Sequence, residues 1–312
     1  MTTVLVLGAN GMLGHRLCRA WQGRFQVHAT TRGDAALPPG VVDPTHLHPG
    51  IDATEPAAVV PALGTVLTRL RPDVVVNAVG LIKQRAEAAD TRQAILVNAW
   101  FPHAAAAVCA EHGARFVHVS TDCVFTGARG GYTEAHPADA DDVYGRSKRL
   151  GEPAPAPGSA VTLRMSLIGR ELAGSHGLVE WFLQQARSGG SVPGFTHAHF
   201  SGLTTQAAAA VIGHVIERHP GLHGTWHVAA ERIAKYDLLR GLATALGLAV
   251  EVAPRPEPVI DRSLDGSAFA GATGWEAPGW PEMLAGLAAD SPWYDRWRGM
   301  ADATQRGEGG SR

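Results

Sequence analysis

Short, continuously apolar segments recur through the first half of the chain, and they limit its fold more than any other feature. Residues 4–7, 73–78 and 116–119 are rich in β-branched side chains, and stretches with helical periodicity separate them. A strand that is apolar at every position is typical of a sheet that is covered on both faces. We therefore predict an α/β fold with a doubly wound parallel sheet.

A glycine-rich turn follows the first of these segments, in VLVLGANGMLGHRL. Glycines between a strand and a helix allow a tight turn and let the backbone approach a pyrophosphate, which the helix N-terminus also attracts. A plain turn is the alternative, but the strand before and the helix after favour a dinucleotide site. No Gly-Lys-Ser/Thr follows, which excludes a nucleoside-triphosphate P-loop. The residues expected to contact the cofactor here are Gly8, Asn10, Gly11, Met12, Leu13 and Gly14.

The second predicted strand, residues 25–31, leads into Arg32. Dinucleotide-binding folds usually hold the ribose 2′-hydroxyl of NAD with an acidic residue at this point. An arginine there favours the 2′-phosphate of NADP, so we predict NADP and leave NAD open. The alternative is that Arg32 is an ordinary solvated surface residue.

The chain divides into a regular first part and a less regular second part. A further strand is predicted at residues 161–166, and helices are predicted at 12–21, 57–70 and 91–112. We predict a Rossmann-type NADP-binding domain over residues 1–168, with residues 204–230 packing back onto it. Glycine-rich, irregular patterning predicts a smaller, mixed substrate-binding lobe over residues 169–300, and composition predicts a disordered tail over 301–312.

The composition is that of an ordinary globular protein, with 45% hydrophobic and 18% charged residues among 312. The 27 basic and 29 acidic residues give a net charge of −2, which does not favour nucleic acid or a membrane as a partner. No apolar run of about 18 to 20 residues and no basic leader stand out, so we expect neither a spanning segment nor a secretion signal. The three cysteines have no CxxC spacing, which fits a reducing cytoplasm.

A tyrosine and a lysine with helical spacing carry the predicted chemistry. Tyr144 and Lys148 are four residues apart and share a helix face. A phenol has a pKa of about 10, and we expect the ammonium, together with an oxidised nicotinamide, to lower it. The strand at 116–119 ends in Ser120 and Thr121, at the sheet edge where ligands bind. Thr121 can therefore hydrogen-bond the oxygen that Tyr144 protonates, whereas Ser120 is better explained as a strand-end cap.

Together these motifs resemble the extended short-chain dehydrogenases/reductases. Within that group the chain most resembles the dTDP-4-dehydrorhamnose reductase family of nucleotide-sugar reductases, over residues 4 to 280. The combination is specific, although each segment alone is weak. The segments that carry the resemblance are GANGMLG, RPDVVVNAVG, VNAWFPHAAAA, VSTDCVFTG, YTEAHPADADDVYGRSKRLGE and GTWHVAAERIAKYDLL.

The resemblance implies hydride transfer from NADPH to the 4-keto group of a nucleotide-linked 4-keto-6-deoxysugar, in deoxysugar or polysaccharide biosynthesis. It makes Thr121, Tyr144 and Lys148 the catalytic residues, with Lys148 also holding the nicotinamide ribose. It implies that Asn98 orders the site. The further cofactor contacts that it implies are Asp52 and Ala53 at the adenine, and Ala78, Val79 and Gly80 at the nicotinamide and its ribose.

Several positions depart from the family pattern. Cys123 stands where these reductases usually have tyrosine and where related dehydratases have glutamate. In the dehydratases that glutamate removes a proton from the sugar ring. The Asp122-Cys123 pair supplies only one carboxylate, so reduction is favoured over dehydration. Asp122 is expected either to contact substrate or to form a turn, and Cys123 is better explained as buried packing than as a reactive thiol. The loop GLIKQRAEAAD and the segment RMSLIGRE also depart, so the identity of the sugar stays open.

A nucleotide-sugar diphosphate needs cations from the second lobe. Arg262 is the first choice, although a surface charge is the simpler interpretation of each candidate. The candidates are Lys83, Arg170, Arg187, Arg255 and Arg262. His197 and His199 have no carboxylate or cysteine at metal spacing, so no metal is predicted.

Two alternatives to a reductase remain. One is an epimerase or dehydratase of the same fold, and the other is a non-catalytic NADP-binding regulatory subunit, such as the β subunit of methionine adenosyltransferase. The presence of Thr121, Tyr144 and Lys148 together favours an enzyme over a binding subunit. No Gly-x-Ser-x-Gly occurs, which argues against a hydrolase. A homodimer is left open.

Overall fold

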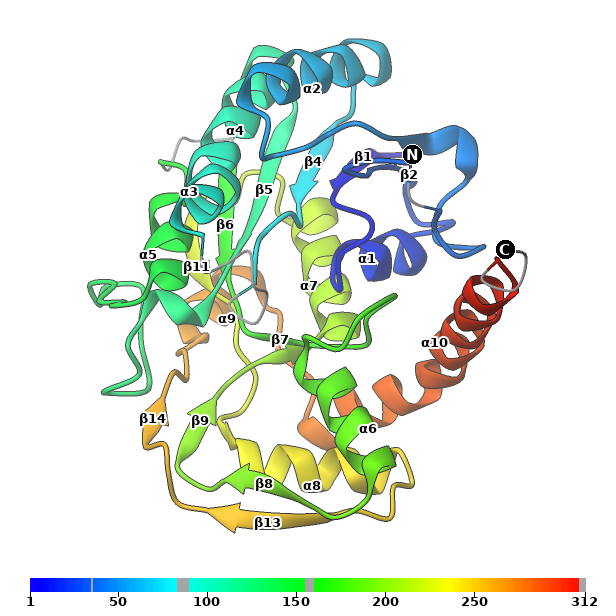
Figure 1. Ribbon diagram of the computed structural model, residues 1–312. Helices are drawn as coiled ribbons and strands as arrows, with labels where there is room; N and C mark the ends of the chain where they lie inside the picture. Colours follow the sequence, from blue (N-terminus) through cyan, green and yellow to red (C-terminus); the bar gives the residue numbers. More distant parts are fainter. Residues whose placement is uncertain (35, 83–89, 155–159, 309–312) are drawn as a thin grey trace.

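A seven-stranded parallel sheet forms the centre of the computed structural model, which describes residues 1–34, 36–82, 90–154 and 160–308 (Figure 1). The strand order is β11-β6-β5-β4-β1-β2-β3, and all six neighbouring pairs are parallel. This confirms the predicted α/β fold with a doubly wound sheet. Its strands are β1 (Thr3–Leu7), β2 (Gln26–Thr30), β3 (Leu47–His48), β4 (Val74–Asn77), β5 (Arg115–Ser120), β6 (Ala160–Arg164) and β11 (Gly224–His227).

Helices cover both faces of this sheet. Val4 and Val6 of β1 belong to a core shared with α1 and α7, whereas Leu5 and Leu7 belong to a core shared with α2 and α4. Successive side chains of β1 therefore pack into two different apolar layers, which is why all four residues from Val4 to Leu7 are apolar. The helices are α1 (Gly14–Ala20), α2 (Pro56–Leu70), α4 (Phe101–Glu111), α5 (Val143–Leu150) and α7 (Thr205–Arg218), and a 3₁₀ turn, η1, spans Pro44–His46.

The chain direction across the sheet reverses between β1 and β4. From β1 the chain moves outward to β2 and β3, and then returns to β4 and continues through β5 and β6 to the other edge. Since all strands are parallel, their carboxyl ends lie along one edge, and ligands of such sheets bind where the order reverses. The glycine turn follows β1 and the Ser120-Thr121 pair ends β5, so both lie at this edge.

The predicted helix over residues 91–112 is interrupted in the structure. It consists of α3 (Thr91–Ala94), a π-helical segment η3 (Ile95–Trp100) and α4. Among the described residues, Thr91–Glu111 is the one helix long and apolar enough to cross a membrane, by an 18-residue window with a mean hydropathy of 1.2. Half of it is buried inside the molecule, and α4 packs on β5 and α2, as a core helix does.

The C-terminal part adds short strands and four helices. Two- and three-stranded sheets form with the orders β10-β7, β12-β9-β14 and β13-β8. The strands are β7 (Leu167–Ile168), β8 (Ser191–Phe195), β9 (Ala198–Phe200), β10 (Leu203–Thr204), β12 (Ile233–Ala234), β13 (Glu251–Arg255) and β14 (Ile260–Asp261). The helices are α6 (Leu178–Ser188), α8 (Lys235–Ala245), α9 (Ser267–Thr273) and α10 (Trp280–Glu308).

Two observations bear on the predicted division of the chain into a domain, a lobe and a disordered tail. Helix α10 runs to Glu308, so residues 301–308 of the predicted tail are helical, and residues 309–312 lie outside the described residues. One apolar core also joins β1 and α1 to α6, α8 and α10. The domain boundary after residue 168 stays a prediction, and within 204–230 the chain supplies α7 to that core and β11 to the main sheet.

Candidate active site

The glycine turn is held close to the sheet by backbone contacts. The Gly11 N–H donates to the Gly8 carbonyl at 3.0 Å, and the Gly8 N–H donates to Thr30 Oγ1 on β2 at 3.3 Å. A Cβ on Gly14 would lie 2.1 Å from the Gly8 oxygen, so only glycine lets α1 start this close to the turn. The approach of α1 explains why the helix begins at Gly14 and not at the predicted Met12.

The other predicted cofactor residues follow the strand order along the same edge. Arg32 is exposed just after β2. Asp52 lies beyond β3 and closes a turn, where its Oδ1 accepts from the Thr54 N–H at 2.9 Å and the Thr54 hydroxyl at 2.8 Å, and Ala53 beside it is buried. Ala78 to Gly80 follow β4, with the Val79 N–H donating to Asn77 Oδ1 at 3.0 Å. An extended dinucleotide fits this order, with its adenine end at β2 and β3 and its nicotinamide at β4.

The turn after β5 places a hydroxyl beside a phenol. Thr121 caps a 3₁₀ turn, η4 (Asp122–Val124), and its Oγ1 accepts from the Cys123 N–H at 3.1 Å and donates to Asp122 Oδ1 at 3.1 Å. Tyr144 on α5 lies close to this turn, because its neighbour Gly145 packs against the Cys123 carbonyl, and the Thr121 side chain lowers the pKa of the Tyr144 phenol. Two residues that are far apart in the sequence are therefore brought together at the carboxyl end of β5.

Two glycines of the predicted motif let α5 reach this position. A Cβ on Gly145 would lie 2.1 Å from the Cys123 carbonyl oxygen, and a Cβ on Gly151 would lie 1.8 Å from the Asn98 carbonyl oxygen. Helix α5 is thus in backbone contact with η4 at one end and with η3 at the other. Asp142 caps it by accepting from the Gly145 N–H at 2.7 Å. This packing fixes the position of Tyr144, which lies next to Gly145.

Lys148 and Asn98 lie between α5 and the end of β4. The buried Lys148 ammonium donates to the Val119 carbonyl at 2.9 Å, and a Cβ on Gly80 would lie 3.8 Å from Lys148 Nζ. Asn98 lies in the π-helical segment, where its amide accepts from the Leu81 N–H at 2.9 Å and donates to the Leu81 carbonyl at 3.1 Å. A π-turn often marks a functional position, and here it aims Asn98 at the segment predicted to line the nicotinamide.

Burial dominates the pKa values at the site. It raises the pKa of the Tyr144 phenol above its usual range, against the hydrogen bond from Thr121, which lowers it. The Tyr144 pKa is therefore raised in the protein, whereas the sequence predicted that Lys148 and an oxidised nicotinamide would lower it. Burial also lowers the pKa of Lys148 to about 8 and raises the pKa of the Cys123 thiol to about 12. Cys123 is therefore a protonated, packed thiol, and all three cysteines are free.

A buried ion pair beneath the site was not predicted. Glu152 accepts from Arg164 at 2.7 and 2.8 Å, and from the Ser120 hydroxyl at 2.7 Å. Ser120 thus anchors the end of β5 to the chain segment after α5, in place of the capping role predicted for it. The one signal in the sequence was Arg164 itself, a charged residue that ends the apolar run of β6.

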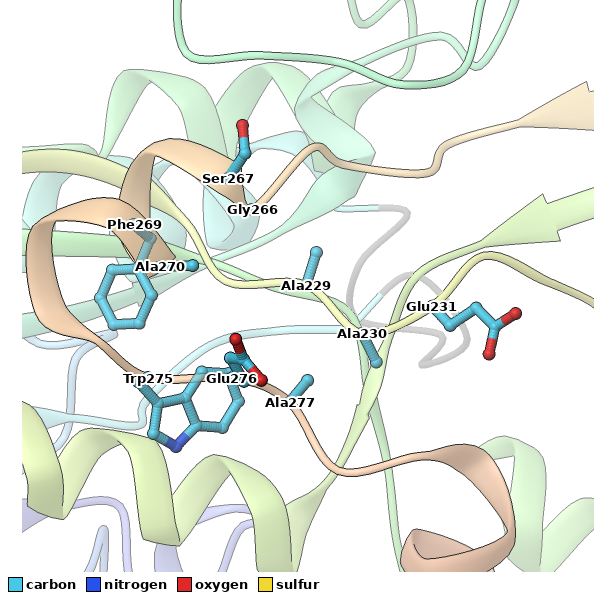
Figure 2. Close-up of a pocket in the computed structure, with 10 residues that line it drawn as sticks. All are labelled: Ala229, Ala230, Glu231, Gly266, Ser267, Phe269, Ala270, Trp275, Glu276 and Ala277. Atoms are coloured by element: carbon cyan, nitrogen blue, oxygen red, sulfur yellow. The ribbon is translucent and has the colours of Figure 1, made fainter.

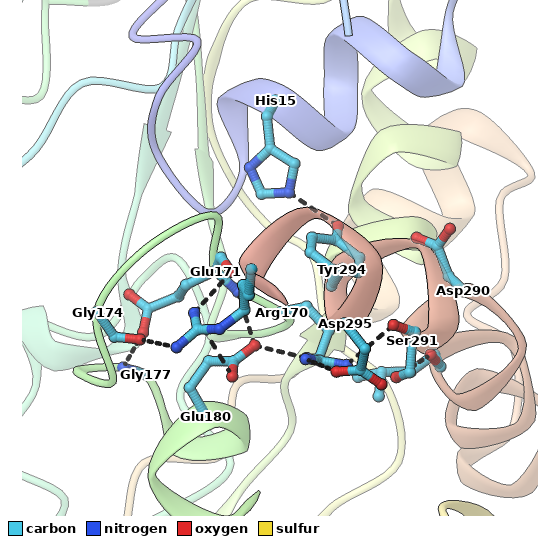
Figure 3. A network of polar contacts seen from close by, with 12 residues as sticks. His15, Arg170, Glu171, Gly174, Gly177, Glu180, Asp290, Ser291, Tyr294 and Asp295 are labelled. Atoms are coloured by element: carbon cyan, nitrogen blue, oxygen red, sulfur yellow. Dashed lines mark hydrogen bonds and ion pairs between the residues drawn. The ribbon is translucent and has the colours of Figure 1, made fainter. Parts of the chain in front are cut away.

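The basic residues predicted as candidate substrate ligands differ in their burial and contacts. Lys83 lies outside the described residues. Arg170 is buried and paired with Glu180 and, at 2.8 Å, with Asp295 of α10, in a network that Figure 3 shows beside the His15–Tyr294 hydrogen bond. Arg170 is therefore not available to a ligand, and its prediction is wrong. Arg187 and Arg255 are exposed, on α6 and at the end of β13.

Among the described candidates, Arg262 reaches the turn after β5, where its Nε–H donates to the Phe125 carbonyl at 2.9 Å. Lys235 at the start of α8 was missed, because nothing in its spacing links it to Thr121. The charges of Asp122, Cys123 and Arg262 act on the pKa of Lys235. No group of three or more His, Cys, Asp or Glu side chains that could hold a metal ion is found within the described residues, His197 and His199 included.

A surface cavity of about 280 Å³ lies at the carboxyl end of β11, three strands away from β4 in the sheet (Figure 2). The rings of Phe269 and Trp275 form part of its wall. None of the predicted site residues lines it. It is therefore separate from the residues that meet at Thr121.

The fold and the site together place the chain among the extended short-chain dehydrogenases/reductases. The family model described as RmlD substrate binding domain matches residues 1–265. The protein belongs to this family.

Relatives support this assignment. A probable dTDP-4,6-dihydroxy-2-methyloxan-3-one 4-ketoreductase of Streptomyces antibioticus is 31% identical over 309 residues, which cover 97% of this chain and 90% of the relative. A dTDP-4-dehydrorhamnose reductase of Burkholderia thailandensis is 34% identical over 49% of this chain and 45% of its own. The crystal structure of a dTDP-4-dehydrorhamnose reductase of Bacillus anthracis in complex with NADP has a TM-score of 0.77 at 20% identity, covering 93% of this chain and 99% of that one. This last likeness shows the shared fold.

Proposed function

We propose that the protein uses NADPH to reduce the 4-keto group of a nucleotide-linked 4-keto-6-deoxysugar, in deoxysugar or polysaccharide biosynthesis. The observation that carries the proposal is the packing of α5 against the turn that Thr121 caps at the carboxyl end of β5, which brings Tyr144 close to Thr121, with Lys148 one helical turn away. The curated relatives named above are dTDP-sugar ketoreductases, which supports this substrate class.

The residues at the sheet edge fit NADP. The glycine turn brings backbone N–H groups and the start of α1 to the point where the strand order reverses. The backbones of Gly8 and Gly14 are in direct contact there. Arg32 would hold the 2′-phosphate, Asp52 the adenine end, and Lys148 with Ala78 to Gly80 the nicotinamide ribose. When bound, NADPH supplies the hydride.

The proton comes from this chain. Thr121 Oγ1 and the Tyr144 phenol would both hydrogen-bond the ketone oxygen, and Tyr144 gives its proton to that oxygen as the carbon accepts hydride. A raised pKa suits this direction, because the phenol stays protonated at neutral pH and is ready to donate. The buried Lys148 ammonium stabilises the phenolate that remains.

Reduction is preferred over dehydration or epimerisation on the chemistry of the turn. Removing a ring proton needs a second base near Thr121, and the two side chains that follow it are one carboxylate, Asp122, and one thiol, Cys123. Burial raises the pKa of this thiol to about 12, so Cys123 is a poor base. The free cysteines fit a cytoplasmic enzyme, and a homodimer stays a prediction.

The test is an absorbance assay of NADPH oxidation against a panel of nucleotide-linked 4-keto-6-deoxysugars. We expect NADPH to be consumed in proportion to a product that carries a new hydroxyl at carbon 4. A product formed without loss of NADPH would indicate a dehydratase or epimerase. Binding of NADPH with no turnover of any sugar on the panel would indicate a regulatory subunit.

A further inference from the structure

Lys235 begins helix α8 directly after β12, a strand of a small sheet whose one face meets the turn after β5. In that sheet Ile233 of β12 is opposite Phe200 of β9, and Ile260 of β14 is opposite Ala198 of β9. Side chains alternate along a strand, so residues two positions apart share a face. Arg262 follows Ile260 by two positions, and its N–H still donates to the His199 carbonyl, so Arg262 lies on the same face as Phe200. The contact of the Lys235 ammonium with the Phe200 ring places this second cation at the same face.

This face covers the turn that begins at Thr121. The side chains of Ile260 and Arg262 pack over Gly127, and the Asp261 N–H donates to the Gly127 carbonyl at 2.7 Å. With the Arg262 bond to the Phe125 carbonyl, these contacts fasten the small sheet to the segment after η4. The face that Lys235 shares with Arg262 is therefore the one that meets the segment after η4.

The Lys235 ammonium is partly buried and has few polar neighbours. It lies 4.6 Å from the centroid of the Phe200 ring, a cation–π contact. Within the described part of the chain, no hydrogen-bond acceptor for Lys235 Nζ is found. Burial lowers its pKa, and the charge of Asp122 raises it. An ammonium in such a place is costly unless its N–H groups find acceptors, and a bound ligand can supply them.

Local charge also favours an oxygen-rich ligand. Lys235 and Arg262 are two cations that face one carboxylate, Asp122. Arg262 donates its Nε–H to the Phe125 carbonyl, whereas the contact found for the Lys235 ammonium within the described residues is with the Phe200 ring. The Phe200 ring beside Lys235 lies on β9, next to β14, and Arg262 after β14 reaches the Phe125 carbonyl. Phe125 is four residues after Thr121, which in the proposed reaction holds the ketone oxygen. A ligand group at Lys235 is therefore close to the reacting carbon.

Building on the reductase function proposed above, we propose that Lys235 is a specificity-determining residue that donates hydrogen bonds to oxygens of the sugar ring beside the carbon that is reduced. It would select ketosugars with an oxygen substituent next to the ketone. It would not contact the diphosphate or the cofactor. The site is thus divided, with the proton donor on the sheet side and the ring-binding cation on the lobe side.

The variant Lys235→Met tests this, because methionine keeps the length of the side chain and removes the charge and the donors. We expect kcat/KM for the ketosugar to fall about 10- to 100-fold, mostly through KM. The affinity for NADPH, from fluorescence titration, and for dTDP alone, from calorimetry, should not change. Arg240→Met is the matched control, since Arg240 is an exposed cation on the same helix, and it should leave all three quantities unchanged.

The binding of dTDP-glucose makes the test independent of turnover. Lys235→Met should weaken dTDP-glucose by a similar factor while dTDP binds as before. Equal losses for dTDP and dTDP-glucose would put the ammonium at the diphosphate, and unchanged kcat/KM and affinities would make Lys235 a structural residue; either result overturns the inference. If the wild type consumes no NADPH with any ketosugar, the proposed function fails, and the dTDP-glucose comparison still decides the role of Lys235.

Discussion

The two sides of the active site are built differently. On the sheet side, Thr121 and the glycine turn sit at the ends of five- and six-residue parallel strands, and α5 is fixed between η4 and η3 by backbone contact. On the lobe side, Lys235 and Arg262 follow strands of two residues each, and side-chain packing and a few hydrogen bonds hold them against the catalytic turn.

This difference suggests a division of labour. The cores on both faces of the main sheet leave the sheet edge little freedom, which suits groups that must hold a hydride donor and a proton donor in fixed geometry. A lobe of short strands can change its side chains without disturbing that geometry. We expect changes on the sheet side to act on turnover, cofactor binding or folding, and changes on the lobe side to act on the choice of sugar.

The largest effect is expected from Tyr144→Phe, which removes the proton donor and keeps the ring. Turnover should fall by about 10²- to 10⁴-fold, the range found for general acid catalysis. NADPH affinity, measured by fluorescence titration, should stay at the wild-type value. If the variant turned over ketosugar at the wild-type rate, Tyr144 would not be the proton donor, and the proposed difference between the sheet side and the lobe side would be wrong.

Lys148→Met should show what a buried ammonium costs on the sheet side. Burial lowers the Lys148 pKa from 10.5 to about 8, so below pH 8 the folded protein carries the full penalty of a buried charge. As pH rises from about 8 to 10.5, the folded state loses this proton before the unfolded state does, and the penalty disappears.

The wild type should therefore gain stability relative to Lys148→Met over this window, by up to about 3 kcal/mol. Denaturant unfolding at a series of pH values measures the difference. Parallel profiles for the two proteins would mean that the ammonium is not desolvated as described.

Gly145→Ala tests the tight packing of α5. The new methyl would meet the Cys123 carbonyl at 2.1 Å and the Ala140 side chain at 2.6 Å, and a backbone carbonyl cannot move aside easily. We expect a loss of about 1 to 3 kcal/mol of stability, together with lower turnover as Tyr144 shifts.

Gly64→Ala is the control for this substitution. Gly64 is also helical, but its nearest atom to a new methyl is His112 Cε1 at 4.0 Å. This variant should gain about 0.5 to 1 kcal/mol, because alanine is the better helix former. If both glycine variants behaved alike in thermal unfolding, the sheet side would be no more tightly packed than the surface.

Arg32→Ala examines the far end of the sheet edge and has the smallest expected effect. Losing a charge-assisted hydrogen bond to the 2′-phosphate should weaken NADPH about 10-fold or more and leave NADH nearly unchanged. Titration of each cofactor against the variant measures this. An equal loss for both would make Arg32 an ordinary surface arginine.

The sequence was sufficient where regular elements carry the function. The continuous apolar runs predicted the parallel sheet, and the glycine turn and the Tyr144–Lys148 spacing rest on local rules that tertiary structure did not change. The π-helical interruption at Asn98 was missed, although Pro102 was a signal for it, because a proline cannot donate a helical hydrogen bond to the Asn98 carbonyl. The direction of the Tyr144 pKa also escaped prediction, since burial outweighs the hydrogen bond from Thr121.

The lobe was less predictable for a physical reason. Strands of two or three residues have no periodicity to detect, so the face shared by Lys235, Phe200 and Arg262 appears only with the pairing register. Arg170 was among the candidate diphosphate ligands, after Arg262 as first choice, and only the contacts with Glu180 and Asp295 show that it is a buried structural residue.

The central claim is that Thr121 and Tyr144 hold a sugar ketone where it receives hydride. Turnover with NADPH deuterated on the transferring face of the nicotinamide tests this most directly, with the product examined by mass spectrometry and NMR. The account predicts one deuterium on carbon 4 of the sugar, at the new hydroxyl, and almost no labelled product from Tyr144→Phe. Product without deuterium at carbon 4, or with the label at another ring position, would contradict it.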